Sequence, residues 1–161
     1  MSVLVPMSEV AFSKYVDAAI AGYAEQNITS GRWVAADALE RSRTEHEKLL
    51  PLGLSTADNY LFDIRDAAGA ETVGSLWLGV VERAGLRIAF IFDVRIDEPY
   101  RRQGHAKRAF KALEPFVRSL GLATIGLHVF AYNTGARALY ESLGYGTTSV
   151  NMHKTLGSDG A

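Results

Sequence analysis

The sequence predicts one α/β domain in which a mixed, mostly antiparallel sheet is flanked by helices on both faces. Three observations lead to this fold class. Runs rich in β-branched and aromatic residues, with turns between them, indicate strands at 60–65, 72–81 and 88–96. Apolar residues at steps of three and four indicate a helix at 106–120, and another strand-like run follows at 123–130. Because strand, helix and strand in succession form a right-handed parallel unit, we expect the strands beside that helix to be parallel.

Length and composition fit a single domain. The chain has 161 residues, 48% of them apolar and 22% charged, and its net charge is −1. About two-thirds of the unfolded surface of such a chain is buried on folding, which is enough for one core. We therefore treat residues 1–161 as one domain, with 157–161 as a frayed tail. Since there is no excess of positive charge, we expect neither nucleic acid nor a membrane as a partner.

The absence of cysteine narrows the possible chemistry. A chain without cysteine has no disulfides, no thiolate metal ligands and no covalent cysteine mechanism. The four histidines, at positions 46, 105, 128 and 153, form no close-spaced metal motif, so we expect no metal. The N-terminus does not resemble a signal peptide, and the apolar runs are too short to span a bilayer. We expect a cytoplasmic protein.

The first fifty residues predict a short strand and two helices. Residues 3–5 form the strand, and Ser8 is placed to cap a helix whose apolar stripe spans 12–23. A polar break at 26–32 precedes a second helix over 33–50, which a proline and a glycine end.

The elements beyond residue 60 are joined by short turns. Turn residues at 66–69 and 82–85 connect three consecutive antiparallel strands. Pro115 lies inside the long helix and is expected to kink or split it, because proline removes a backbone hydrogen bond. Residues 134–143 predict a short helix, and residues 145–156 predict one or two closing strands.

A basic turn joins the strand at 88–96 to the long helix, with the sequence Arg101-Arg102-Gln103-Gly104-His105-Ala106. The N-terminus of a helix presents unpaired N–H groups and partial positive charge, which suit a phosphate. Gly104 allows the backbone to approach a ligand closely. The alternative is a solvated basic turn without a ligand, and the spacing alone does not decide between the two.

Two motifs resemble a known family. The pattern Arg101-x-x-Gly104-x-Ala106 resembles the Arg/Gln-x-x-Gly-x-Gly/Ala signature of the GCN5-related N-acetyltransferase (GNAT) superfamily. Asn133-Thr-Gly-Ala-Arg-Ala-Leu-Tyr140-Glu-Ser-Leu-Gly-Tyr145 is similar to its Asn-x-x-Ala-x-x-Leu-Tyr-x-x-x-Gly-Phe/Tyr segment. The motifs occur in the family's order, and the chain resembles a bacterial, uncharacterised branch. Arg102 departs from the pattern, since glycine is common there, and the departure is tolerated if φ stays negative.

The resemblance implies a fold and a cofactor. In the family the two parallel neighbours splay apart, and the pantetheine arm of acetyl-CoA enters the gap and pairs with exposed strand backbone, as an added strand would. The N–H of Val94 is then the expected donor to the thioester oxygen, and the basic turn binds the pyrophosphate. Asn133 is expected to contact the pantetheine, although it could instead serve only as a helix cap. The implied cofactor-binding residues are Val94, Arg95, Ile96, Arg101, Arg102, Gln103, Gly104, His105, Ala106, Asn133 and Tyr140.

The implied reaction is direct transfer of the acetyl group from the thioester to a primary amine. Such a reaction requires a neutral amine, a donor for the oxyanion and a proton for the departing thiolate. Tyr140 matches the family tyrosine near the cofactor sulfur, so we expect it to donate that proton. The alternative is that Tyr140 is a core residue, because Ala136, Leu139 and Leu143 share its helical stripe.

The general base is less determined. Asp93 is a charged residue within an apolar strand and His128 lies on the expected neighbouring strand, so either could relay a proton. The alternatives are an Asp93 paired with Arg95 or Arg87 and a half-buried, hydrogen-bonded His128. We expect His105 to be a tolerated side chain beside the phosphates, and His46 to lie on a helix face.

Two other functions compete with catalysis. A non-catalytic acyl-CoA-binding regulatory module could use the same fold, although it would not need Tyr140 as a proton donor. A nucleic-acid binder is disfavoured because the sequence has no extended basic face and no basic pI. The expected partners are acetyl-CoA and an amine acceptor. The sequence decides neither the acceptor nor the oligomeric state, so a homodimer stays open.

Overall fold

The computed structural model describes residues 2–158 and contains one five-stranded sheet in the order β1-β2-β3-β4-β5. Strands β1 to β4 pair antiparallel, and β4 and β5 pair parallel, which confirms the predicted mixed sheet. The elements are β1 (Leu4–Pro6), α1 (Glu9–Thr29), α2 (Ala35–Leu49), η1 (Gly53–Ser55), β2 (Asn59–Arg65), β3 (Thr72–Arg83), β4 (Leu86–Ile96), η2 (Glu98–Tyr100), α3 (His105–Ser119), β5 (Ile125–Leu127) and α4 (Thr134–Ser142).

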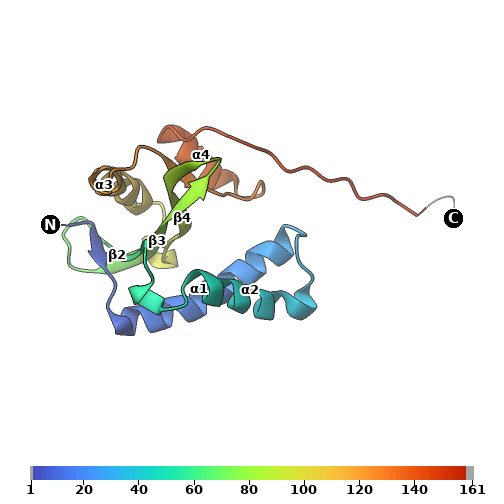
Figure 1. Cartoon of the computed structure of the whole chain (residues 1–161), viewed down its shortest axis with the longest axis horizontal. Helices are drawn as coiled ribbons and strands as arrows, with labels where there is room; N and C mark the ends of the chain where they lie inside the picture. The colour runs from blue at the N-terminus through green and yellow to red at the C-terminus, as the bar shows by residue number, and fades with distance from the viewer. Residues whose placement is uncertain (1, 159–161) are drawn as a thin grey trace.

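Helices cover both faces of the sheet, as predicted. Figure 1 shows α1 and α2 on one side of the strands and α3 and α4 on the other. The main core lies between the sheet and α3, where Leu76, Leu78 and Leu113 are fully buried. A smaller core under α1 contains Trp77 and Leu61. The two helical layers therefore approach β4 from opposite faces.

The N-terminal helices differ slightly from the expected bounds. The hydroxyl of Ser8 accepts a hydrogen bond from the N–H of Ala11 at 3.2 Å, which confirms it as the N-cap of α1. Helix α1 continues to Thr29, through the first part of the predicted break. The chain then turns because the carbonyl of Asn27 accepts the N–H groups of Arg32 and Trp33. None of the helices between residues 2 and 158 is long and apolar enough to cross a membrane.

Pro115 does not split α3, which was one of the two outcomes predicted for it. The helix runs unbroken from His105 to Ser119. Pro115 lies on its exposed side, where the carbonyl of Lys111, which has lost its partner, can bind water instead. The buried stripe of α3, which includes Phe110 and Val117, holds the helix against the sheet.

The chain after α3 contains less strand than predicted. Only Ile125–Leu127 of the expected 123–130 run forms a strand, which is β5. The closing strands expected at 145–156 are absent from the described structure. Gly146 and Thr148 still line a pocket beside α3, and the chain after them runs outward from the domain (Figure 1). A strand needs a neighbour for its backbone hydrogen bonds, and this segment has none among residues 2–158.

Candidate active site

Strand β4 contains a bulge at the centre of the sheet. Asp93 lies opposite Trp77 of β3, whereas Ile91 lies opposite Leu78, so Phe92 is an extra residue without a partner. A bulge adds one residue to one strand and bends it. As a result Phe92 stacks on Trp77, with 4.7 Å between ring centroids, on the face that α1 covers.

The bulge reverses the direction of the backbone groups along β4. Before it, the N–H of Ala89 donates to Thr124 beside β5, at 3.0 Å. Beyond it, the N–H of Asp97 donates to the carbonyl of Val73 on β3, at 2.9 Å. Ala89 and Asp97 are an even number of positions apart, so in a regular strand their N–H groups would point to the same side. Since N–H directions alternate along a strand, the N–H groups of Val94 and Ile96 face away from β3, on the side of β5.

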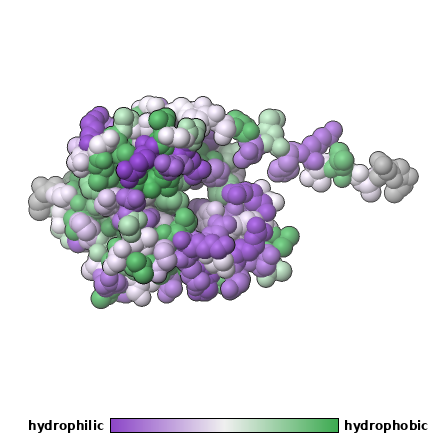
Figure 2. Space-filling view, viewed as in Figure 1, coloured by the Kyte–Doolittle hydropathy of each residue, from purple (hydrophilic) through white to green (hydrophobic). Residues whose placement is uncertain are grey.

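Strand β5 does not follow β4 past the bulge. The two strands pair only from Ala89 opposite Ile125 to Ile91 opposite Leu127, whereas β4 continues to Ile96. A pocket of about 370 Å³ lies where the strands part, between β4, the loop after β5, α1 and α2. Figure 2 shows the molecule hollowed between the two helical layers. The expected gap between the parallel neighbours is therefore present.

The basic turn lies beyond the end of β4 and is open to solvent. Gly104 is the N-cap of α3 with a φ of +81°, and it is exposed. The Nε of Arg101 donates to the carbonyl of Ile96 at 2.9 Å, which attaches the turn to the gap side of β4. Gln103 is also exposed, and its side-chain amide donates to the carbonyl of Pro99 at 3.2 Å. The turn can therefore be reached by a ligand.

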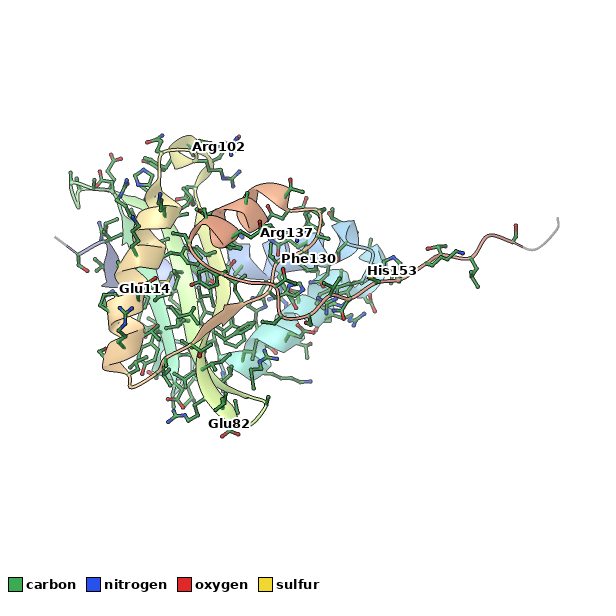
Figure 3. All side chains as sticks on the ribbon, turned by 90° about the horizontal axis from the view of Figure 1, so that it is seen from above. Glu82, Arg102, Glu114, Phe130, Arg137 and His153 are labelled. Atoms are coloured by element: carbon green, nitrogen blue, oxygen red, sulfur yellow. The ribbon has the colours of Figure 1, made fainter. Side chains whose placement is uncertain are left out.

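Two residues of the turn depart from expectation. Arg102 has a φ of +64°, so the condition of a negative φ is not met, and its side chain points outward at the end of α3 (Figure 3). A left-handed conformation explains why glycine is common at this position. His105 is only 7% exposed, packs edge-on against Tyr100 and contacts the guanidinium of Arg108. Its side chain therefore supports the turn from inside, and only its backbone, with that of half-buried Ala106, lies along the turn.

Tyr140 lies at the edge of both the core and the pocket. Its ring packs on Phe110 with 5.3 Å between centroids, and the same residue lines the pocket. Burial raises the pKa of the phenol, and the negative charge of Asp93 raises this pKa further. No side chain among residues 2–158 hydrogen bonds to its hydroxyl. The group is therefore protonated and available for a ligand.

Asn133 is the predicted helix cap and also lies in the pocket. It is the N-cap of α4, and its Oδ1 accepts the N–H of Ala136 at 3.3 Å. The residue is exposed and lines the pocket, so its side-chain NH₂ group stays available to a ligand.

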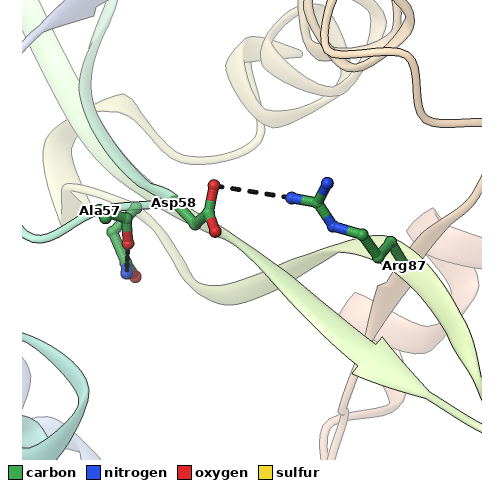
Figure 4. Close-up of polar contacts among 4 residues, drawn as sticks. Ala57, Asp58 and Arg87 are labelled. Atoms are coloured by element: carbon green, nitrogen blue, oxygen red, sulfur yellow. Dashed lines mark hydrogen bonds and ion pairs between the residues drawn. The ribbon is translucent and has the colours of Figure 1, made fainter.

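Asp93 lies at the inner end of the pocket, where β4 meets α1. Its Oδ2 accepts the hydroxyl of Tyr15 at 2.8 Å. Burial raises the pKa of the carboxyl group, while the bond from Tyr15 and the charge of Arg95 partly offset this rise. Arg87 is not its partner, because it pairs with Asp58 at 3.7 Å between exposed side chains (Figure 4).

His128 lies one residue beyond β5 and not within the strand. Its side chain is exposed and packs edge-on against Phe130, with 4.8 Å between centroids. Partial burial lowers the pKa of this imidazole, and the positive charge of Arg32 lowers it further. Asp93 of β4 and His128 of the loop after β5 line the same pocket.

A second histidine lies in the pocket, although the sequence placed it only on a helix face that could border the acceptor site. His46 on α2 is 7% exposed, lines the pocket and packs edge-on against Tyr23. Its Nδ1 lies 2.8 Å from the carbonyl of Ser42. Since a carbonyl can only accept, Nδ1 carries the proton. The Ser-x-x-x-His spacing was visible in the sequence, but the packing of α2 over β4 was not.

This geometry agrees with comparisons to known proteins. Residues 18–145 match the sequence pattern of the Acetyltransferase (GNAT) family. The chain belongs to this family. The GNAT chain is 38% identical to the uncharacterized N-acetyltransferase YycN of Bacillus subtilis over 153 residues, which are 95% of this chain and 97% of YycN. It is 35% identical to YdgE of the same organism over 93% of this chain and 95% of YdgE.

The crystal structure of YycN has the same fold, with a TM-score of 0.90 at 37% identity over 96% of this chain and 98% of that chain. A [ribosomal protein bS18]-alanine N-acetyltransferase of Escherichia coli is 35% identical over 72 residues, 45% of this chain and 49% of that enzyme. The GNAT chain is an N-acetyltransferase, as the two motifs predicted.

Proposed function

We propose that this GNAT protein transfers the acetyl group of acetyl-CoA directly to a primary amine, with Tyr140 donating a proton to the CoA thiolate. The observation that carries the proposal is the gap beside Val94–Ile96, which lies between an open basic turn and the half-buried carboxylate of Asp93. Acetyl-CoA would supply the activated acetyl group, and this chain's residues would orient it, accept one proton and donate another.

The residues present fit the cofactor's two parts. The gap-side N–H groups of Val94 and Ile96 would bind a pantetheine arm as an added strand, with Val94 as the donor to the thioester oxygen. The exposed backbone of the turn at 101–106, with the positive charges of Arg101 and Arg102, suits the pyrophosphate. Asn133 would contact the pantetheine amides through its NH₂ group.

Each proton has a proposed donor and acceptor. The amine nitrogen attacks the thioester carbon, the carbon–sulfur bond breaks, and the sulfur takes the proton of the Tyr140 hydroxyl. Asp93 accepts the proton that the amine loses, directly or through water, and a carboxyl pKa raised toward neutrality makes it a better base. His128 is the second candidate for this relay, because its lowered pKa keeps it neutral.

The acceptor would enter from the α1 and α2 side of the pocket. Tyr23 and Glu45 line this side, opposite Phe90 of β4. The bS18-alanine N-acetyltransferase acts, by its name, on a protein alanine. A protein N-terminus is therefore one acceptor to test, beside amino acids, small amines and aminoglycosides.

Two measurements test the function. The first is CoA-induced thermal stabilisation, and the second is acetyl-CoA consumption across these amine classes. We expect stabilisation by CoA and turnover with one class. Stabilisation without turnover with any class would favour the non-catalytic acyl-CoA-binding module, and the absence of stabilisation would refute the proposed site.

A further inference from the structure

The charged residues that line the candidate active-site pocket have an excess of positive charge. Besides its two histidines, the lining includes three arginines and two carboxylates, namely Arg32, Arg83, Arg95, Glu45 and Asp93. A simple alkylamine is a cation near pH 7, because its pKa is about 10.4. This pocket therefore disfavours a plain amine and favours an amine that also carries a negative group.

Arg95 is engaged at the inner end of the pocket. Its Nη2 donates to the carbonyl of Ala18 on α1 at 3.4 Å. Burial raises the pKa of Asp93, and the charge of Arg95 partly offsets this rise. A Cβ added at Gly22 would lie 2.6 Å from the same Nη2, so α1 packs closely on this guanidinium. Arg95 and Asp93 therefore balance each other, and the excess charge falls on the other two arginines.

Arg32 and Arg83 are exposed, and their guanidinium groups lie over aromatic rings. The Cζ of Arg83, at the end of β3, lies 4.7 Å from the ring centroid of Phe90 on β4. The Cζ of Arg32, between α1 and α2, lies 5.8 Å from the ring centroid of Phe130, on the loop after β5 (Figure 3). The edge of a guanidinium that lies over a ring stays available to bind a carboxylate through two parallel hydrogen bonds.

Neither of these groups is neutralised by a salt bridge. Within residues 2–158, neither Arg32 nor Arg83 forms an ion pair or donates a side-chain hydrogen bond, whereas three other arginines form ion pairs. Burial raises the pKa of Tyr23, the charge of Glu45 raises it further, and the charge of Arg32 lowers it. The charge of Arg32 is therefore felt inside the pocket, and both guanidinium groups have N–H groups available to a ligand.

The place of Arg83 along β4 determines the span of a ligand. Phe90 lies under Arg83 and is three positions before Asp93, the proposed base. At about 3.3 Å per residue these two positions are roughly 10 Å apart. Since each charged group of a ligand lies about 3 Å from its partner, an amine and a carboxylate roughly 4–10 Å apart can reach both ends. An α-amino acid is too short for this span.

We propose that Arg32 and Arg83 form an anion-binding subsite, and that the acceptor is a primary amine with a carboxylate roughly 4–10 Å from its nitrogen. The amine would lie at Asp93 and the carboxylate at the arginines, and the rings of Phe90 and Phe130 would contact the apolar part between them. The place of the amine rests on the proposed acetyl transfer. An acidic residue near a peptide N-terminus and a free ω-amino acid both have this chemistry.

Matched pairs of acids and amides measure the preference. Calorimetric titration in the presence of CoA gives the Kd of alanine, ω-aminobutyric acid and ω-aminohexanoic acid, and of their amides, without turnover. A second arm uses tetrapeptide amides of alanine with one glutamate at the second, third or fourth position, and their glutamine counterparts. We expect the longer acids to bind about fivefold more tightly than their amides, and alanine to show no such preference. The arm with the lower Kd identifies the source of the acceptor.

Exposed arginines provide matched variants. Arg83→Gln and Arg32→Gln should each reduce the acid preference to about twofold or less, while the Kd of the amides and of CoA stays near wild type. Arg87→Gln removes an exposed arginine outside the pocket, which pairs with Asp58, and should keep the full preference. Equal Kd values for longer acids and their amides, or a preference that survives in both pocket variants, would overturn the subsite. A Kd for CoA that rises in these variants would overturn it in favour of a cofactor role.

Binding and turnover distinguish the subsite from the reaction. An acid preference in the CoA complex without consumption of acetyl-CoA would refute acetyl transfer and support the subsite. Turnover of acids and amides with equal kcat/KM would support acetyl transfer and refute the subsite.

Discussion

The hydroxyl of Tyr15 on α1 donates a hydrogen bond to Oδ2 of Asp93 on β4, with 2.8 Å between the oxygens. This contact joins the N-terminal helical layer to the strand that forms the gap, across 78 positions of sequence. It also stabilises the charged form of a carboxylate that burial disfavours. The N-terminal half of the chain therefore controls the candidate base.

Removal of this bond should move the pH dependence of catalysis. Tyr15 lowers the pKa of Asp93, so Tyr15→Phe should raise that pKa further. If Asp93 must be ionised to act, the acidic limb of the kcat/KM profile should shift to higher pH. Tyr60→Phe, on β2 against Phe116, is the control and should leave the limb in place. An unmoved limb in Tyr15→Phe would exclude Asp93 as the titrating base.

Asp93→Asn should separate activity from stability. A base contributes about 10²–10⁴-fold to the rate, so we expect a loss of kcat in that range. Folding raises the pKa of Asp93, so the protonated carboxyl group favours the folded state. This contribution to the free energy of unfolding is full below the pKa of Asp93 in the unfolded chain, and it is lost as the pH rises through the pKa of Asp93 in the folded protein. At pH 7 the variant should therefore melt at a higher temperature than wild type.

The difference in melting temperature between Asp93→Asn and wild type should shrink as the pH falls toward about 4, near the ordinary aspartate pKa. Thermal melts at several pH values measure this. A lower melting temperature for Asp93→Asn at pH 7 would contradict a carboxylate that is destabilised by burial.

Tyr140→Phe should affect chemistry more than binding. The ring packing on Phe110 is kept and the proton is lost, so kcat should fall about 10²-fold or more with little change in the KM for acetyl-CoA. Tyr145→Phe is a close control, because its ring lies 6.1 Å from that of Tyr140 in the same cluster. If kcat is unchanged in Tyr140→Phe, the residue belongs to the core alone.

Arg102→Gly should stabilise the fold and weaken cofactor binding. A left-handed residue other than glycine costs roughly 1–2 kcal/mol, and the greater unfolded freedom of glycine offsets roughly 0.5–1 kcal/mol of the gain. The lost charge should raise the Kd for CoA a few-fold, and less so at high salt. Ala84→Gly, with a φ of +51° in the β3–β4 turn, should give the stability gain without the binding loss. Calorimetric titration of both variants separates the two effects.

The elements that depend on short stretches of sequence were predicted correctly. The strand, turn and helix around Gly104 and the short helix of Tyr140 follow from periodicity and from two motifs. The φ of Arg102 and the continuity of α3 through Pro115 did not follow, because both depend on surroundings that a local pattern does not contain. The extra residue in β4, Phe92, appears only once β3 is placed beside it. His46 likewise depends on the packing of α2 over the sheet.

The reversal of backbone direction at Phe92 should be visible in amide hydrogen exchange. In the free protein the N–H of Arg95 is on the β3 side and that of Ile96 faces the gap, so protection should alternate from one residue to the next. A pantetheine arm that extends the sheet would slow exchange at Ile96 and leave Arg95 almost unchanged. A single bulge therefore makes this stretch of β4 a site-specific reporter of cofactor occupancy that needs no acceptor.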